Sequence, residues 1–276
     1  MIWQTTRFQI DLSQPRVMGI VNVTPDSFSD GGAHASLKQA LRHAETLIEE
    51  GADILDIGGE STRPGSPPVP LEAELARVLP LVRELVKLGI PISIDTYKPE
   101  VMEATLDLGV DIINDVWALR QRGAEAVVAG HPSCGTCLMH MHRDPQSMQV
   151  SPMEGVIVGE VAAFLQSRAQ RMEALGVHRA RIVLDPGVGF GKSVAQNFSL
   201  LSQQSELLKP GYPLLVGWSR KSSLGAVTGV AEPARRVTAS VAAALLAAVG
   251  GARLLRVHDV SPTVEALAVF RAMQTH

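Results

Sequence analysis

The chain has 276 residues and a formal net charge of −3 at pH 7, from 25 Lys and Arg against 28 Asp and Glu. This balance argues against a nucleic-acid binder, which needs a basic patch; no apolar run is long enough for a membrane span, and the first residues lack a signal pattern. The 2 cysteines argue against a disulfide scaffold. We therefore expect one cytoplasmic enzyme domain over residues 1–276, with neither nucleic acid nor membrane as a partner.

The predicted elements begin with a short lead-in over residues 1–16, which we expect to form a hairpin. Short apolar runs follow it, and each ends at a polar or charged side chain. Such runs are typical of strands buried on both faces of a parallel sheet. In chain order they are residues 17–21 before Asn22, 53–57 before Glu60, 91–94 before Asp95, 111–113 before Asn114, 136–139 before His140, 182–184 before Asp185, 214–216 before Lys221 and 254–257 before His258.

Helical patterns lie between these strands. Residues 37–48, 71–88, 161–175 and 239–249 have apolar positions spaced by three and four, as an amphipathic helix requires. Strands that alternate with helices pair in parallel through right-handed crossovers. The sequence therefore predicts an α/β fold, a single (β/α)8 TIM barrel, which typically has about 250 residues. We expect the polar strand ends to share the mouth of this barrel and the lead-in to close its other end.

Loops after three of the strands carry side chains that suit a ligand. Asn22 precedes a stretch rich in Pro, Ser, Asp and Gly that contains Phe28, and it shares its strand-end position with the other polar groups, which favours a functional role over a plain turn cap. Arg63 follows a glycine pair and, taken alone, is better explained as a surface arginine. Asp185 opens a Gly-rich loop that carries Phe190.

Two nucleotide-binding motifs are excluded for this last loop. A P-loop needs Gly where Pro186 stands, and the dinucleotide pattern needs its third Gly where Lys192 stands. The loop is therefore not expected to cradle a nucleotide phosphate.

A zinc site is an alternative for residues 131–140, because His131, Cys134, Cys137 and His140 recur at every third position and Cys₂His₂ sets do bind zinc. However, Cys137 and His140 would point to opposite faces of a strand, and the usual long gap between ligand pairs is missing. Buried thiols that flank this strand are the favoured interpretation.

Eight motifs, in order along the chain, resemble those of the dihydropteroate synthase family. They extend from Met18 to Val260 and therefore cover nearly the whole sequence. The motifs are the segments 22–32, 60–65, 94–96, 112–116, 138–141, 185–192, 217–222 and 256–260.

This resemblance implies a transferase of folate synthesis, which joins 6-hydroxymethyl-7,8-dihydropterin diphosphate to 4-aminobenzoate and releases 7,8-dihydropteroate and pyrophosphate. It also implies Mg²⁺ as the cofactor and a homodimer. Carried onto this chain, it assigns the pterin to Asp95, Asn114, Met139, Asp185, Lys221 and Arg256, and the diphosphate to Asn22, Arg256 and His258, with Asn22 also at the metal. It assigns 4-aminobenzoate to Phe28, Thr62, Arg63, Pro64, Phe190, Lys221 and Ser222. The implied catalytic residues are Asn22, Arg63, Asp95, Asp185, Lys221, Arg256 and His258.

The chemistry of these residue types agrees with the implied substrates. A carboxylate such as Asp185 matches the adjacent N–H donors on the edge of a pterin, and Lys221 can donate to the ring carbonyl. Asp95 and Asp185 at one ligand would repel each other unless Lys221 or the ligand's donors lie between them. We expect Ser222 to begin a helix that faces the carboxylate of 4-aminobenzoate, although a plain N-cap explains it equally well when it is taken alone.

Two other functions are weighed against this one. A pterin-binding methyltransferase that hands a methyl group to a corrinoid would share the pterin end but has no use for Arg63 and Ser222. A non-catalytic pterin-binding paralogue would be signalled by the loss of Arg63, Lys221, Phe190 or Arg256, and all four are present.

Overall fold

The computed structural model describes residues 1–23, 32–61, 65–144, 147–148 and 150–275. In these residues eight strands form one sheet, in the spatial order β8-β7-β6-β5-β4-β3-β10-β9. Each strand lies within two residues of a predicted apolar run. The strands are β3 (Arg16–Asn22), β4 (Ile54–Gly58), β5 (Ile92–Asp95), β6 (Ile112–Asp115), β7 (Gly135–Met139), β8 (Ile182–Asp185), β9 (Leu215–Val216) and β10 (Leu254–Val257).

The two ends of this sheet meet and close it into a barrel. All named neighbours pair in parallel, and β8 joins β9 through a single bridge between Leu184 and Leu214. The backbone N–H of Leu184 also donates to the carbonyl of Pro213 at 3.0 Å. The fold is therefore the predicted (β/α)8 barrel, with its thinnest connection between β8 and β9.

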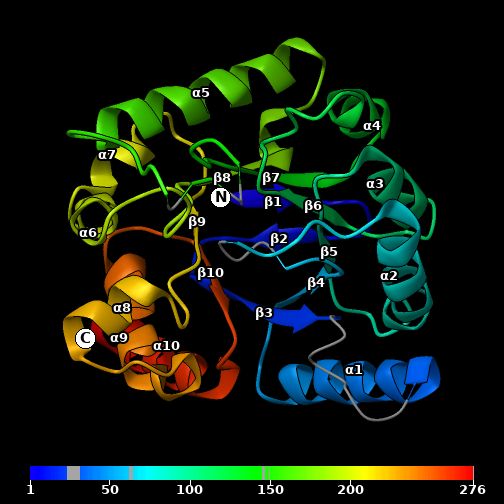
Figure 1. Cartoon of the computed structure of the whole chain (residues 1–276), viewed down its shortest axis with the longest axis horizontal. Helices are drawn as coiled ribbons and strands as arrows, with labels where there is room; N and C mark the ends of the chain where they lie inside the picture. Colours follow the sequence, from blue (N-terminus) through cyan, green and yellow to red (C-terminus); the bar gives the residue numbers. More distant parts are fainter. Residues whose placement is uncertain (24–31, 62–64, 145–146, 149, 276) are drawn as a thin grey trace.

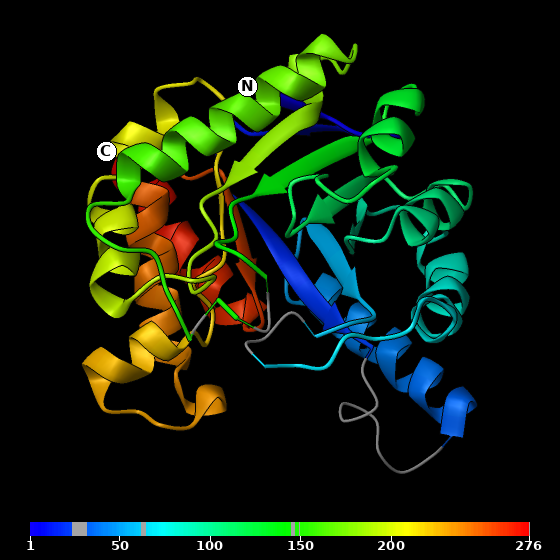
Figure 2. The ribbon, with the colours of Figure 1, turned by 45° about the horizontal axis from the view of Figure 1, so that its top comes forward.

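Helices surround the strands on the outside (Figures 1 and 2). The predicted amphipathic segments lie in α1, α2, α5 and α9, although α2 ends at Leu85, three residues before the predicted end at residue 88. None of the described helices combines the length and the apolar character that a bilayer crossing needs. The helices are α1 (Gly32–Glu49), α2 (Leu71–Leu85), α3 (Pro99–Leu106), α4 (Ala124–Gly130), α5 (Val158–Ala174), α6 (Val194–Ser202), α7 (Gln204–Leu208), α8 (Ser222–Thr228), α9 (Val237–Val249) and α10 (Val260–Thr275), with short 3-10 turns at Arg179–Arg181 and Pro233–Arg235.

The lead-in forms the expected hairpin, from β1 (Ile2–Gln4) and β2 (Gln9–Asp11), which pair antiparallel. Trp3 is fully buried, and its indole N–H donates to the carbonyl of Arg181 at 2.9 Å, just before β8 begins. The same side chain packs with residues from the strands, among them Met18, Ile54 and Val183. The hairpin therefore closes the end of the barrel where the strands start, as predicted, and leaves the other end to the strand-end residues.

Candidate active site

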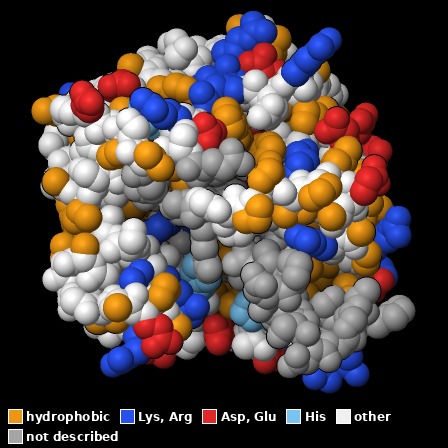
Figure 3. All heavy atoms as spheres, viewed as in Figure 1, with side chains coloured by type: hydrophobic (Ala, Val, Ile, Leu, Met, Phe, Trp, Pro, Cys, Tyr) orange, Lys and Arg blue, Asp and Glu red, His pale blue; other side chains and the backbone are white. Residues whose placement is uncertain are grey.

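The register of the sheet brings predicted residues from separate strands to neighbouring positions. Asn22 at the end of β3 lies opposite Gly58 of β4, and Gly58 lies opposite Asp95 of β5. Asp95 in turn lies opposite Asn114 of β6. Figure 3 shows Lys or Arg and His side chains gathered around a hollow in the molecular face seen in Figure 1.

Arg256, on β10, is the partly buried centre of an ion-pair network at these strand ends. Its Nε donates to Oδ2 of Asp56 at 2.6 Å, and its Nη2 donates to Oδ2 of Asp95 at 2.7 Å. The second oxygen of Asp95, Oδ1, is buried and has no hydrogen-bond partner among the described residues. Burial raises the pKa of Asp95, whereas the Arg256 charge pulls it down. A buried acceptor without a partner is the kind of group that a donor on a ligand would satisfy.

Asp56 was not among the predicted site residues, yet it organises this network. Its carboxylate is fully buried and accepts from Ser93 Oγ at 2.6 Å, from the Asn114 amide at 3.3 Å and from Arg256. A usable signal existed in the sequence, because a carboxylate inside an apolar strand must find a charged or hydrogen-bonding partner. Arg256, rather than Lys221, is thus the cation that pairs with Asp95.

Asp185 ends β8 and is held by the turn that follows it. Its Oδ1 accepts the backbone N–H of Gly187 at 2.7 Å. Gly187 has φ +66°, and a Cβ there would lie 1.9 Å from the carbonyl oxygen of His140, so only glycine fits. Burial raises the pKa of Asp185 to about 6, although the Gly187 N–H and the charges of Lys221, Lys192 and Arg256 act in the opposite direction.

Lys221 and Phe190 form one wall beside this turn. The ammonium nitrogen of Lys221 lies 4.3 Å from the centre of the Phe190 ring, which is a cation–π contact. Phe190 also belongs to an apolar cluster with Met139, and the other members are Val116, Met141 and Met148, with Tyr97 and Trp117 packed against them. The site therefore offers a flat group both an apolar surface and a cation next to the Asp185 carboxylate.

Ser222 begins α8 as expected, and its side chain is exposed. The N-cap of this helix is Lys221, without a side-chain cap hydrogen bond. The interpretation of Ser222 as a plain N-cap is therefore wrong, because Ser222 occupies the first helical position.

The loops after β9 and β10 are tied together around His258. Ser219 Oγ accepts the backbone N–H of His258 at 3.1 Å and lies 3.0 Å from His258 Nδ1. One residue further along each loop, Arg220 and Asp259 form an ion pair at 2.6 Å. These contacts fix His258 relative to Lys221.

Four predicted residues, Phe28, Thr62, Arg63 and Pro64, lie outside the described residues. The other predicted residues lie at the strand ends or in the loops that follow them. Asp95 forms an ion pair with Arg256, and Asn114 is linked to Arg256 through Asp56. The Arg256 charge also acts to lower the pKa of Asp185.

The four candidate zinc ligands have other partners. His131 Nδ1 accepts the backbone N–H of Cys134 at 2.9 Å, and His140 Nδ1 lies 3.0 Å from Lys192 Nζ. Cys137 packs in the buried layer beside the N-terminal hairpin. In the part of the chain that the structure describes, no three His, Cys, Asp or Glu side chains are placed to hold a metal ion.

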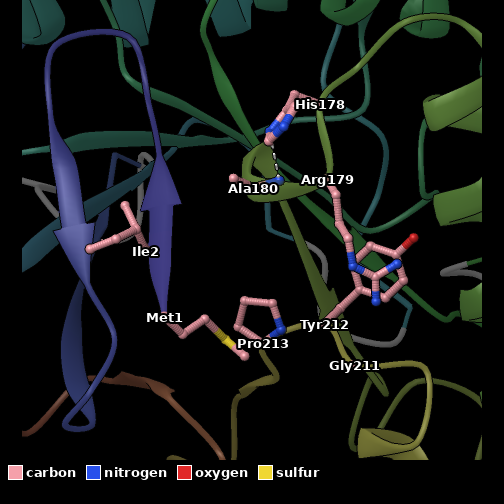
Figure 4. Close-up of a pocket in the computed structure, with 8 residues that line it drawn as sticks. All are labelled: Met1, Ile2, His178, Arg179, Ala180, Gly211, Tyr212 and Pro213. Carbon is pink, nitrogen blue, oxygen red and sulfur yellow. Dashed lines mark hydrogen bonds between the residues drawn. The ribbon is translucent and has the colours of Figure 1, made fainter.

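A pocket of about 230 Å³ lies at the opposite end of the barrel (Figure 4). It is formed where the N-terminal hairpin meets the segments that lead into β8 and β9, with the Arg179 guanidinium 3.8 Å from the Tyr212 ring centre. None of the predicted site residues that the structure describes lines it. Its lining consists of Met1, Ile2, His178, Arg179, Ala180, Gly211, Tyr212 and Pro213.

Comparison with known proteins agrees with the geometry of the strand-end site. Residues 18–258 match a family model described as pterin binding enzyme. A dihydropteroate synthase of Neisseria meningitidis serogroup B is 50% identical over 277 aligned positions, which cover 99% of this chain and 97% of the relative. The crystal structure of Burkholderia cenocepacia dihydropteroate synthase complexed with 7,8-dihydropteroate is 50% identical with a TM-score of 0.91, and covers 99% of this chain and 96% of that one.

A second solved structure of a dihydropteroate synthase is similarly close to this chain in sequence and in fold. Xanthomonas albilineans dihydropteroate synthase with 4-aminobenzoic acid is 49% identical, has a TM-score of 0.93 and covers 100% of both chains. Since the family model spans most of the sequence and the relatives align over nearly all of it, the chain belongs to the dihydropteroate synthases of the pterin-binding enzyme family.

Proposed function

We propose that the mouth of the barrel binds a 6-hydroxymethyl-7,8-dihydropterin diphosphate beside 4-aminobenzoate, and that residues 1–276 act as one domain. The chain is a transferase of folate synthesis that joins these substrates into 7,8-dihydropteroate with release of pyrophosphate. The observation that carries the assignment of the site is the Arg256 network, which leaves Oδ1 of Asp95 buried and without a hydrogen-bond partner among the described residues.

The pterin is assigned to the carboxylates and the residues around them. Asp185 accepts from adjacent N–H donors of the pterin edge, and Oδ1 of Asp95 accepts from a further donor. Asn114 both donates and accepts, which suits the ring nitrogens, and Lys221 donates to the ring carbonyl. Met139 supplies apolar contact, and its side chain is buried in the cluster with Phe190.

The diphosphate is assigned to Arg256, His258 and Asn22. In Arg256, Nε donates to Asp56 and Nη2 donates to Asp95, so Nη1 is the nitrogen assigned to the diphosphate. Asn22 offers an amide oxygen that suits Mg²⁺, which often takes one or two protein oxygens together with substrate phosphates. Gly58 leaves room beside this oxygen, because even a Cβ at Gly58 would stay 3.5 Å from it. Bound Mg²⁺ would neutralise charge on the diphosphate.

The 4-aminobenzoate is assigned to the wall formed by Phe190 and Lys221, with Ser222 near its carboxylate. The motif residues Phe28, Thr62, Arg63 and Pro64 complete this assignment. The complex of the Xanthomonas albilineans relative with 4-aminobenzoic acid supports a site for this substrate.

The reaction follows from charge and position. The neutral arylamine attacks the methylene carbon of the pterin, the bond from this carbon to oxygen breaks, and diphosphate leaves with the electron pair. The amine then loses a proton to water. In a loose transition state, negative charge grows on the leaving oxygen, where Arg256, His258 and Asn22 stabilise it. A strong general base is not needed, because the amine is already neutral at pH 7.

The direct test is release of pyrophosphate from purified protein with both substrates and Mg²⁺, measured with and without 4-aminobenzoate. Release that depends on 4-aminobenzoate is expected. A corrinoid methyltransferase or a non-catalytic paralogue would release none.

Two variants test the site assignment. Arg256→Lys, which loses the forked contact, and Asp185→Asn should each lower kcat/KM by about tenfold or more. If both stayed within about threefold of the parent, the site assignment would be wrong.

A homodimer in the cytoplasm completes the proposal. α9 and α10 pack together and expose apolar side chains, with exposed fractions of 59% for Leu246, 57% for Val249, 70% for Val269 and 64% for Met273. Apolar surface of this kind is typical of subunit interfaces. Sedimentation should show a dimer, and Leu246→Glu together with Val269→Glu should yield monomers. A parent chain that sediments as a monomer at micromolar concentration would contradict the proposal.

A further inference from the structure

Lys192 is a buried lysine that none of the assignments above uses. Only 3% of it is exposed, and its Nζ contacts four acceptors. They are the carbonyl oxygens of Gly187 at 2.9 Å, Phe190 at 3.1 Å and His140 at 3.3 Å, and Nδ1 of His140 at 3.0 Å.

The surroundings of Lys192 require a group that only donates. Burial and the Lys192 charge lower the pKa of His140 to about 2, so its ring is neutral and Nδ1 can accept a hydrogen bond. The ring is fixed in place by an edge contact with Phe164, with 4.9 Å between the ring centres. Carbonyl oxygens cannot donate, and an ammonium group brings three hydrogens to these four acceptors, whereas a hydroxyl brings one and an amide two.

The turn that surrounds Lys192 carries parts of both substrate sites. On one side, the Gly187 N–H donates to Asp185, whereas the Gly187 carbonyl accepts from Lys192. At the other end of the turn, the Phe190 carbonyl accepts from Lys192 while its ring packs on Lys221. The same ammonium thus links the strand-end carboxylate, the aromatic wall and the end of β7.

We propose that Lys192 is a positioning residue for both substrates, which holds the turn 187–190 so that Asp185 meets the pterin and Phe190 lies against Lys221 at the 4-aminobenzoate site. This inference rests on the proposed roles of those two sites. Without the ammonium, buried carbonyls would lose their donor, and the turn would move to regain one.

The main test is Lys192→Met, which keeps the length and burial of the side chain and removes its donors. The Michaelis constants for the pterin substrate and for 4-aminobenzoate should both rise by about tenfold. A merely structural role would instead lower the fraction of active enzyme and leave both constants unchanged, and that result would overturn the proposal. The matched control is Lys209→Met, since Lys209 is an exposed lysine paired with Glu206 three residues away. It should behave as the parent.

Chemical rescue separates hydrogen bonding from charge. In Lys192→Ala, methylammonium or ethylammonium should recover activity by about fivefold or more, because these cations have N–H donors and fit the space of the missing side chain. Tetramethylammonium has the charge without a donor and should give no recovery. Equal recovery with all three cations would contradict the proposal.

A further variant covers the case in which the Lys192 variants do not fold. His140→Phe keeps an aromatic ring beside Phe164 and removes the Nδ1 acceptor, together with Nε2, so both Michaelis constants should rise by about threefold. Unchanged constants in this variant would also overturn the inference. Failure of the proposed function is a different result, because the parent enzyme itself would then release no pyrophosphate.

Discussion

Arg256 donates from its Nε to the fully buried carboxylate of Asp56 at 2.6 Å, across 200 positions of sequence. The fork of the guanidinium spans Asp56 and Asp95, so the two carboxylates fix both its position and its plane. Asp56 has no assigned contact with substrate, yet the residues proposed to bind the pterin and the diphosphate depend on it.

Asp56→Asn should therefore lower kcat/KM by about tenfold or more, because an amide cannot hold the guanidinium as a carboxylate does. Steady-state pyrophosphate release measures the effect, with circular dichroism to show that the variant is folded. Asp53→Asn is the matched control. It makes the same change at the other end of the strand, where Asp53 pairs with Arg16 and is 30% exposed, and it should stay within about twofold of the parent. Equal losses in both variants would count against a specific role for Asp56.

Activity should depend on the protonation of Asp185. Since burial raises its pKa to about 6, kcat/KM for the pterin substrate should fall about tenfold per pH unit below that value, as the carboxylate loses an acceptor. The profile should be measured from pH 5 to 8, and in Asp185→Asn this acid limb should be absent. An acid limb that persisted unchanged in the variant would assign it to another group.

The same raised pKa makes a prediction about stability. A carboxyl whose folded pKa lies above its unfolded value of 3.8 favours folding most below that value, and this contribution is lost as the pH rises through about 6. At pH 8 the ionised Asp185 should therefore destabilise the fold, and Asp185→Asn should raise Tm. Thermal unfolding of both proteins at pH 8 tests this, and a lower Tm for the variant would contradict it.

Gly187→Ala should destabilise the protein by about 3 kcal/mol or more, because a clash with the His140 carbonyl adds to backbone strain. Gly109→Ala separates the two effects, since Gly109 has φ +91° with open space around its Cβ position. It should cost only about 1–2 kcal/mol. Urea unfolding gives both values, and similar losses would show that strain alone explains the glycine at position 187.

Ser222→Ala should raise the Michaelis constant for 4-aminobenzoate more than that for the pterin substrate. Ser222 is the first residue of α8, directly after Lys221, and it is assigned to the carboxylate of 4-aminobenzoate. A rise of about threefold is expected. Initial rates with each substrate varied in turn provide the test. Equal changes in the two constants would argue against this assignment.

The fold and the position of most candidate site residues at the strand ends could be predicted because each apolar run stops at a polar group. In runs such as 182–184 before Asp185, an apolar segment stops at a polar group, and barrel geometry then requires these groups to meet. Asp56 was not predicted as a site residue because it lies within its apolar run, two residues before the strand ends at Gly58. Its inward position depends on the pairing register, which local pattern does not reveal.

Lys192 could not be predicted for a different reason. The sequence shows a lysine after a Gly-rich turn and excludes the nucleotide motifs, but the three carbonyl oxygens around its ammonium converge only through the backbone conformation of the turn. The cation that pairs with Asp95 was likewise uncertain from sequence, because the reach of Arg256 across the barrel depends on the packed structure.

The narrow connection between β8 and β9 has a consequence for the local stability of the barrel. Asp185 is the last residue of β8, and Lys221 lies in the loop after β9. The two groups assigned to the pterin ring therefore lie on either side of the β8–β9 seam, which one bridge joins. Segments with few hydrogen bonds open at the lowest free energy. We therefore expect the barrel to open at this seam at a lower free energy than between the fully paired strands on the far side.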